Sequence, residues 1–252
     1  ELSGPIGAPV VCLSHCFGAD YHFWTPHLPA FEGFRVLRYD TRGHGQSRAP
    51  SGPFSLEMLA GDTLALLDAL AIDRVHFAGV SMGGMIGQTI AIDHADRIGS
   101  LALINTTPRY SAEQRELWRE RGALVESEGV DVVHADLMRR WFTDHAIASK
   151  LPGYNYMAEV FRRFEPASFA AAASALCQLD TVHRLQDISV PTLVVAADDD
   201  PGVPVALSQL LADRIAGAML HWLSPARHLA SLEHVDAFNG IMRKFLAEVG
   251  QR

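Results

Sequence analysis

A serine between two glycines lies where an apolar run gives way to a helical pattern. The run covers Val75 to Ala78, and Gly79-Val80-Ser81-Met82-Gly83 follows it. Gly-x-Ser-x-Gly between a strand and a helix is typical of a tight turn that exposes a strained serine hydroxyl. Glycines fit such a turn because a side chain there would collide with the neighbouring strand and helix. The pattern predicts a nucleophilic serine, although a serine that merely caps the helix fits the same five residues.

Two further residues supply what a nucleophilic serine needs. A serine hydroxyl is a weak nucleophile at neutral pH, so it requires a base, and the base requires a carboxylate that orients it. Asp200 follows the strand pattern Pro191 to Ala197, and His228 follows the strand pattern Ala218 to Leu223. Since the carboxyl ends of parallel strands meet at one edge of a sheet, we predict a triad of serine, Asp200 and His228.

Three adjacent aspartates leave the choice of the acid open. Asp200 precedes Pro201, which restricts the aspartate backbone and ends the ladder of the strand. This favours a side chain that crosses the loop towards the histidine. Asp198 is the alternative acid, and Asp199 is expected to face solvent. Asn105, which follows another strand pattern, carries no charge and cannot take this role.

Two backbone amides are expected to form an oxyanion hole. When a serine attacks a carbonyl, negative charge develops on the carbonyl oxygen, and amides at a helix start stabilise it. The amide of Met82 directly follows the serine, and the second donor is expected in the loop after the first strand, at Phe17. His44 in Arg42-Gly43-His44-Gly45 is expected to brace its loop by hydrogen bonds rather than to take part in chemistry.

Strand patterns alternate with helical patterns along most of the chain. The strand patterns are Pro9 to Leu13, Phe34 to Tyr39, Val75 to Ala78, Ser100 to Ile104, Pro191 to Ala197 and Ala218 to Leu223. The helical patterns between and after them are Ser55 to Leu70, Met82 to His94, Ser208 to Ile215 and Val235 to Val249. This alternation predicts an α/β fold, with a mostly parallel sheet and helices on both faces.

The alternation stops between Ser111 and Asp187. Helical patterns follow one another there, at Glu113 to Glu126, Val130 to Trp141 and Pro166 to Leu179, with breaks expected at Pro152-Gly153 and Pro166. An insertion of this length is too long for an ordinary loop. We therefore predict an α/β core made of residues 1–110 and 188–252, with residues 111–187 as a helical lid. An accessory helical layer that does not contact substrate is the alternative.

Composition restricts the partners of the chain. Its 252 residues contain 21 Lys and Arg against 29 Asp and Glu, a formal net charge of −8, which argues against binding nucleic acid or an anionic membrane surface. No apolar run approaches the roughly 18 to 20 residues that span a bilayer, and nothing resembles a secretory leader. Three cysteines suit a reducing compartment. We expect a cytoplasmic protein that binds neither nucleic acid nor membrane.

Cys12, His15, Cys16 and His22 lie close together in the sequence but do not predict a metal site. Cys12 belongs to a strand pattern whose alternation buries it. Neither a His-Glu-x-x-His motif nor a phosphate-binding Gly-x-x-x-x-Gly-Lys-Ser/Thr motif is present. We expect no metal and no cofactor.

The chain resembles the α/β-hydrolase superfamily over nearly its whole length. The segments that carry the resemblance are Gly79 to Gly84, Asp40 to Ser47 and the segment around His228. The order serine, acid, histidine along the chain is also that of this superfamily. Within it, the chain is most similar to the 3-oxoadipate enol-lactonases. The similar segments are Phe34 to Ser47, Leu64 to Leu70, Ser81 to Gly84 and Arg140 to Thr143, and more loosely Ser14 to Tyr21 and Ala230 to Phe238.

The resemblance implies a cofactor-free hydrolase that opens a small enol-lactone in bacterial aromatic catabolism. Ser81 would form an acyl-enzyme, and water activated by His228 would release the acid. Such a lactone carries a free carboxylate, and the candidate partners in the lid are Arg140 and the adjacent Trp141. A surface arginine next to a core tryptophan is the alternative.

Some segments differ from the pattern of the enol-lactonases. Leu13 to Gly18 reads Leu-Ser-His-Cys-Phe-Gly where that family usually has Leu-Ser-Asn-Ser-Leu-Gly, and the N-terminal hairpin is not expected within Glu1 to Ala8. Other enzymes with the same triad therefore remain alternatives: a broader esterase, an acyl-homoserine-lactone hydrolase, a carbon–carbon hydrolase or a perhydrolase. A more remote alternative is a non-catalytic ligand-binding protein, which the complete triad disfavours.

Overall fold

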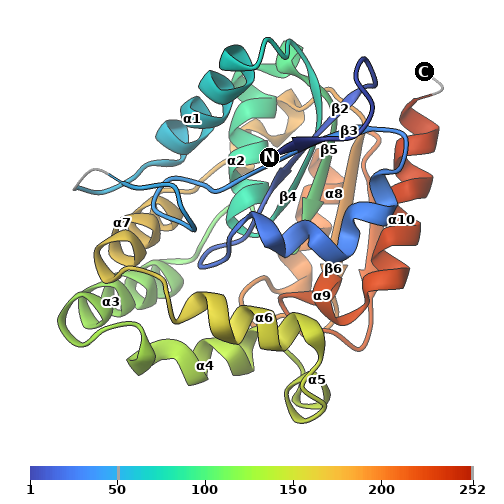
Figure 1. The fold of residues 1–252 in the computed structure, drawn as a ribbon. Coiled ribbons are helices and arrows are strands. Elements are labelled where there is room, and N and C mark those ends of the chain that lie inside the picture. The colour runs from blue at the N-terminus through green and yellow to red at the C-terminus, as the bar shows by residue number, and fades with distance from the viewer. Residues whose placement is uncertain (50–51, 251–252) are drawn as a thin grey trace.

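A twisted sheet forms the centre of the molecule (Figure 1). The computed structural model describes residues 1–49 and 52–250, and in these ranges the sheet has seven strands in the order β1-β3-β2-β4-β5-β6-β7. The strands are β1 Leu2–Ser3, β2 Val10–Ser14, β3 Arg35–Tyr39, β4 Val75–Val80, β5 Ile98–Ile104, β6 Thr192–Ala197 and β7 Met219–Leu223. All neighbouring pairs are parallel except β1 with β3. The expected α/β architecture is confirmed.

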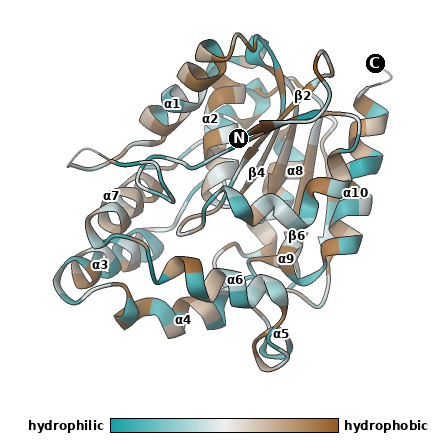
Figure 2. Ribbon diagram, in the orientation of Figure 1, coloured by the Kyte–Doolittle hydropathy of each residue, from teal (hydrophilic) through white to brown (hydrophobic). Residues whose placement is uncertain are grey.

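The inner strands are buried because helices cover both faces of the sheet. Every residue of β6 is buried, as is nearly every residue of β4 and β5, which explains why these strands read as continuous apolar runs. Figure 1 shows α2 and α10 on opposite sides of the sheet. The covering helices are η1 Tyr21–Phe31, α1 Leu56–Ala69, α2 Met82–Asp93, α8 Val205–Arg214 and α10 Val235–Val249. In Figure 2 the central strands are mostly hydrophobic, whereas α10 alternates between hydrophobic and polar residues.

Between β5 and β6 the chain leaves the sheet and forms helices that we call the cap. They are α3 Ala112–Glu128, α4 Asp131–Trp141, α5 Asp144–Ala148, α6 Pro152–Phe161 and α7 Pro166–Cys177, and η3 Val182–Asp187 leads back to the sheet. The cap helices gather along one end of the sheet (Figure 1). Ser111 begins the insertion with a capping box, in which its side chain and that of Gln114 bond each other's backbone amides.

The prolines lie where the sequence indicated breaks between helices. Pro166 begins α7, as the helical pattern from Pro166 predicted, and Pro152 begins α6, a helix that the sequence did not predict. A missing amide hydrogen costs nothing at the first position of a helix. The N-terminal segment does contain a short strand, in which Leu2 pairs antiparallel with Leu37 of β3.

Four short helices were not anticipated from the sequence. They are η2 Ala95–Arg97, α5, η3 and α9 Ala230–Glu233, each too short to show a clear hydrophobic period. Within the ranges that the structure describes, no helix combines the length and the apolar character that crossing a membrane requires.

Candidate active site

Ser81 occupies the junction between β4 and α2 in a strained conformation. Its φ of 52° and ψ of −112° place a residue with a side chain in a region that such residues rarely adopt. Although Ser81 precedes α2, its side chain makes no capping hydrogen bond. Its Oγ lies instead 2.8 Å from Nε2 of His228. The alternative of a serine that merely caps a helix is therefore wrong.

The glycines on either side of Ser81 allow a close approach of backbone segments. A Cβ added at Gly79 would lie 2.2 Å from the carbonyl carbon of Gly83, and one added at Gly83 would lie 2.3 Å from the carbonyl oxygen of Ser14. Both distances are far below van der Waals contact, and both involve backbone that cannot rotate away. The turn is thereby pressed against the end of β2.

His228 connects the serine to a buried carboxylate. Its Nδ1 lies 2.7 Å from Oδ2 of Asp200, whose Oδ1 accepts hydrogen bonds from the amides of Gly202 at 2.8 Å and Val203 at 3.0 Å. An ionised carboxylate only accepts, so Nδ1 carries the proton that it donates to Asp200. Nε2 is then free to accept the hydroxyl proton of Ser81. This is the arrangement that a nucleophilic serine requires.

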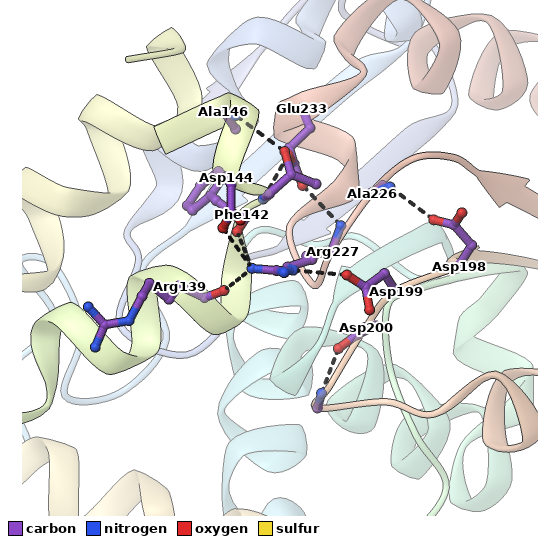
Figure 3. Close-up of polar contacts among 12 residues, drawn as sticks. Arg139, Phe142, Asp144, Ala146, Asp198, Asp199, Asp200, Ala226, Arg227 and Glu233 are labelled. Carbon is purple, nitrogen blue, oxygen red and sulfur yellow. Dashed lines mark hydrogen bonds and ion pairs between the residues drawn. The ribbon is translucent and has the colours of Figure 1, made fainter. Parts of the chain in front are cut away.

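The three adjacent aspartates have different surroundings (Figure 3). Asp198 accepts hydrogen bonds from the hydroxyl of Ser224 at 2.5 Å and the amide of Ala226 at 2.9 Å, and the bond from Ser224 contributes most to lowering the pKa of this carboxyl. The side chain of Asp199 is 71% exposed, as expected. Of the three, Asp200 is the residue whose carboxylate contacts the histidine.

The amides of Phe17 and Met82 lie at the same edge of the sheet as Ser81. Met82 is the first residue of α2, and Phe17 follows β2, which pairs with β4 so that Ser14 stands opposite Gly79. In the part of the chain that the structure describes, neither amide donates to a protein acceptor.

The side chain of Phe17 packs against the cap. Its ring centre lies 5.0 Å from that of Trp118, 5.2 Å from that of Phe164 and 4.8 Å from that of Phe169. These aromatic rings come from α3, from the segment after α6 and from α7. The loop that carries the Phe17 amide is therefore in direct contact with the insertion.

His44 braces its own loop, as expected from the sequence. Its Nδ1 donates to the carbonyl of Arg42 at 3.1 Å, and its ring lies 4.5 Å from that of Phe164. Burial, assisted by the nearby His15, lowers the pKa of His44 to about 3, so the imidazole is neutral. Within the residues that the structure describes, His44 forms no hydrogen bond with Ser81 or with the other two residues of the triad.

Arg140 and Trp141 lie at the end of α4, above the loop that carries Asp200. Nη2 of Arg140 is 3.4 Å from the carbonyl oxygen of Pro201. Trp141 is buried, and its ring packs edge-on to that of Phe161 with a centroid distance of 5.2 Å. Within the described ranges, Arg140 has no carboxylate partner at ion-pair distance.

A second arginine of the cap, Arg121 in α3, did not stand out in the sequence. Its guanidinium is largely buried, lies 5.5 Å from the ring centre of Trp118 and pairs with Asp136 at 2.7 Å. Burial, followed by the charge of Arg140, lowers the pKa of Arg121. The two arginines are therefore electrostatic neighbours, and Arg121 alone of the two pairs with a carboxylate in the described residues. The sequence signal was the three-residue spacing of Trp118 and Arg121.

Within the ranges that the structure describes, no cluster of three or more His, Cys, Asp or Glu side chains is arranged to hold a metal ion. Cys12 lies fully buried in β2, as the strand pattern indicated, and burial raises the pKa of its thiol to about 12. This thiol is therefore neutral and packs as a small apolar side chain.

Residues 9–235 match the family described as the alpha/beta hydrolase fold, and the chain belongs to this family. It is 32% identical over 247 residues to 3-oxoadipate enol-lactonase 2 of Acinetobacter baylyi, an alignment that covers 96% of this chain and 91% of that protein. It is 34% identical over 260 residues to the putative carbamate hydrolase RutD of Variovorax paradoxus, covering 99% of this chain and 96% of that protein.

A solved structure is also similar over almost the whole chain. The enol-lactonase from Burkholderia xenovorans LB400 superposes with a TM-score of 0.94 at 36% identity, covering 98% of this chain and 95% of that one. Family membership and these relatives identify the protein as an enzyme of the hydrolase class.

Proposed function

We propose that the protein is a serine hydrolase that cleaves small carboxylic esters or lactones through an acyl-enzyme. The main support is the pair of hydrogen bonds that join the three side chains, 2.8 Å from Ser81 to His228 and 2.7 Å from His228 to Asp200. Burial of all three residues excludes competing water from these bonds. The complete arrangement disfavours a non-catalytic binding protein.

Attack of the serine begins the reaction. His228 takes the hydroxyl proton of Ser81 through Nε2 while Oγ bonds to the substrate carbonyl carbon. Asp200 stabilises the resulting imidazolium through Nδ1. The negative charge on the carbonyl oxygen is received by the amides of Phe17 and Met82. As the tetrahedral intermediate collapses, the imidazolium gives its proton to the leaving oxygen.

Water then completes the reaction. His228 takes a proton from the water molecule, whose oxygen attacks the acyl carbon. As the second intermediate collapses, the imidazolium returns its proton to Oγ of Ser81, and the carboxylic acid is released. In a lactone, the leaving oxygen remains on the acyl chain, so the product is one open molecule instead of an acid and an alcohol.

The proposed substrate is 3-oxoadipate enol-lactone or a close analogue, as part of aromatic catabolism in the cytoplasm. The two similar enol-lactonases support this substrate. The arginines of the cap also support it, because Arg140 and Arg121 offer positive charge to a substrate that carries a free carboxylate. In this proposal, the core comprises residues 1–110 and 188–252, and residues 111–187 act as a lid over the site.

A small carbamate is a second candidate substrate. The similarity to a putative carbamate hydrolase is of the same order as that to the lactonases. The same serine would attack a carbamate carbonyl, so the triad alone does not separate the two. The broader esterase, acyl-homoserine-lactone, carbon–carbon and perhydrolase alternatives also depend on what the lid admits.

Turnover of three substrates by the wild type and by Ser81→Ala tests the proposal. The substrates are p-nitrophenyl acetate, enzymatically generated 3-oxoadipate enol-lactone and a small carbamate. We expect turnover of the ester and the lactone, reduced by at least about a thousandfold in Ser81→Ala. Turnover of the carbamate alone would move the assignment to the second candidate. Equal rates in the wild type and in Ser81→Ala would contradict the role of the serine.

A further inference from the structure

The loop that carries His228 is bonded to the cap on both sides of the histidine. On one side, the amide of Leu229 donates to the carbonyl of Trp141 at 3.0 Å. On the other, Nη1 of Arg227 donates to the carbonyls of Arg139 at 2.7 Å and Phe142 at 3.3 Å. The acceptors all belong to residues 139–144, the end of α4 and the start of α5, which we call the anchor segment.

A single carboxylate adds a second connection between the same two parts of the chain. Oε2 of Glu233 accepts hydrogen bonds from the amide of Thr143, at 3.1 Å, and from its hydroxyl. Oε1 of Glu233 accepts from the amide of Arg227 at 3.0 Å. Figure 3 shows Glu233 between the anchor segment and the loop. Glu233 thus holds the backbone immediately before His228 against the start of α5.

Arg227 also contacts the loop of the triad acid. Its Nε lies 3.1 Å from Oδ2 of Asp199, the neighbour of Asp200, and its Nη1 lies 3.5 Å from Oδ1 of Asp144 (Figure 3). These two carboxylates are 71% and 89% exposed, so the ion pairs are screened and weak. The stronger bonds are those to the main-chain carbonyls at the end of α4, where a cation is favoured by the helix dipole.

We propose that Arg227 and Glu233 are positioning residues that make the placement of His228 depend on the seated cap. Neither touches the reacting atoms, and both act through the backbone of residues 226–233. With the anchor segment in place, the loop holds Nε2 of His228 at 2.8 Å from the serine hydroxyl. Without the bonds of Arg227 and Glu233, the backbone before the histidine loses these connections to the cap, and the bond from the amide of Leu229 to the carbonyl of Trp141 remains after it. The cap therefore contributes to proton transfer as well as to substrate binding.

Arg227→Met tests this role because methionine keeps the unbranched apolar stem of the side chain and removes its donors. Arg97→Met is a matched control, since Arg97 donates to the carbonyls of Asp73 at 2.7 Å and Ile72 at 3.0 Å and has similar exposure, but contacts neither the cap nor the loop. We expect Arg227→Met to lower kcat on p-nitrophenyl acetate at least tenfold with KM within about twofold, because small displacements of catalytic groups are costly. Arg97→Met is expected to keep kcat.

Thr143→Val provides a smaller change within the anchor segment. It removes the hydroxyl bond to Glu233 and the N-cap bond that the hydroxyl accepts from the amide of Ala146, without altering the loop of the histidine, and we expect a three- to tenfold loss of kcat. If Arg227→Met fails to fold, Thr143→Val decides the question. Melting temperatures are measured alongside. If Arg227 had a merely structural role, Arg227→Met and Arg97→Met would both have lower melting temperatures, and their kcat values would be the same. That result would overturn the proposal.

The kinetic readout rests on the proposed serine-hydrolase function, so a second readout does not use hydrolysis. In a crystal structure of Arg227→Met, we expect Nε2 of His228 to lie more than about 3.5 Å from the serine hydroxyl, beyond hydrogen-bond distance. An unchanged distance would overturn the proposal. If the wild type hydrolyses nothing and Ser81 fails to react with a fluorophosphonate, the proposed function fails, while the crystal structure still decides the positioning role.

Discussion

Two residues at the carboxyl ends of neighbouring strands have backbone conformations that residues other than glycine rarely adopt. Ser81 after β4 has a φ of 52°, and Asn105 after β5 has a φ of 44°. Both lie beside the triad, since Nδ2 of Asn105 is 3.4 Å from Oδ2 of Asp200 after β6, and Oγ of Ser81 is 2.8 Å from Nε2 of His228. Strain of this kind is concentrated where side chains are held for chemistry rather than for packing.

Arg140, beside the loop that carries Asp200, provides a prediction about specificity. Arg140→Gln removes a half-buried cation that has a main-chain carbonyl as its hydrogen-bond partner. For mono-p-nitrophenyl succinate, which carries a carboxylate, we expect KM to rise about tenfold, because one charge-assisted hydrogen bond to the substrate is lost. For neutral p-nitrophenyl butyrate, we expect KM within about twofold of the wild type. Steady-state kinetics on the two esters measure both.

The neighbouring arginine provides the control for that experiment. Arg139 is adjacent in the chain and exposed, and its guanidinium points away from the anchor segment in Figure 3. Arg139→Gln removes the same charge and is expected to leave both KM values unchanged. If Arg140→Gln affects the two esters equally, Arg140 does not recognise a carboxylate.

At the scale of elements, the contact between the cap and the loop after β2 is tight enough to test. Gly18 follows Phe17 at a φ of 74°, and a Cβ added there would lie 2.4 Å from the ring of Phe161 in α6. Phe161 is fully buried, so its ring cannot turn freely away. We expect Gly18→Ala to displace the loop and to lower kcat about tenfold on p-nitrophenyl acetate, as small misplacements of oxyanion donors do.

Gly33→Ala separates this contact from backbone strain. Gly33 has a φ of 87°, but an added Cβ would meet nothing within 4 Å. Both variants should lose about 1 kcal/mol of stability from the left-handed backbone conformation. Only Gly18→Ala should also lose activity, and equal kcat values in the two variants would show that the cap does not constrain the loop.

Elements whose residues show a clear period were predicted from the sequence within a few residues. The buried strands were recognisable from apolar runs, and Ser55 indicated the start of α1, where its side chain accepts the amide hydrogen of Met58. Helix α6 was missed because Pro152 and Gly153 suggest a break. Tertiary contacts decide otherwise, since Gly153 packs against Leu232, which leaves no room for a larger side chain.

At the scale of the whole molecule, the parallel sheet explains why the triad could be predicted from the sequence. The contacts that hold the loop of His228 against the cap could not be predicted. Residues that follow parallel strands meet at one edge, so Ser81, Asp200 and His228 could be grouped from their places in the sequence. The contacts of Arg227 and Glu233 with the cap join residues 88 and 90 positions apart. No local pattern marks such pairs, and only the seating of the cap brings them together.

Burial of neutral histidines predicts a loss of stability in mild acid. His27 donates through Nδ1 to Asn239 at 2.9 Å, and burial lowers its pKa to about 4 from an ordinary value near 6.5. Below pH 6.5 the unfolded chain binds a proton at His27, whereas the folded protein does not, so the free energy of unfolding falls as pH falls. Between pH 7 and 5 this histidine alone should cost about 2 kcal/mol. Buried His44 adds a loss in the same direction.

Replacing His27 should flatten this pH dependence. His27→Gln keeps a donor for Asn239 and removes the proton uptake of the unfolded state, so its free energy of unfolding should change by about 2 kcal/mol less than that of the wild type between pH 7 and 5. Urea unfolding at the two pH values measures the difference. His183→Gln, at an exposed position, should leave the wild-type pH dependence unchanged. If the free energy of unfolding depends on pH in both variants as it does in the wild type, burial of neutral His27 does not cause the loss of stability in acid.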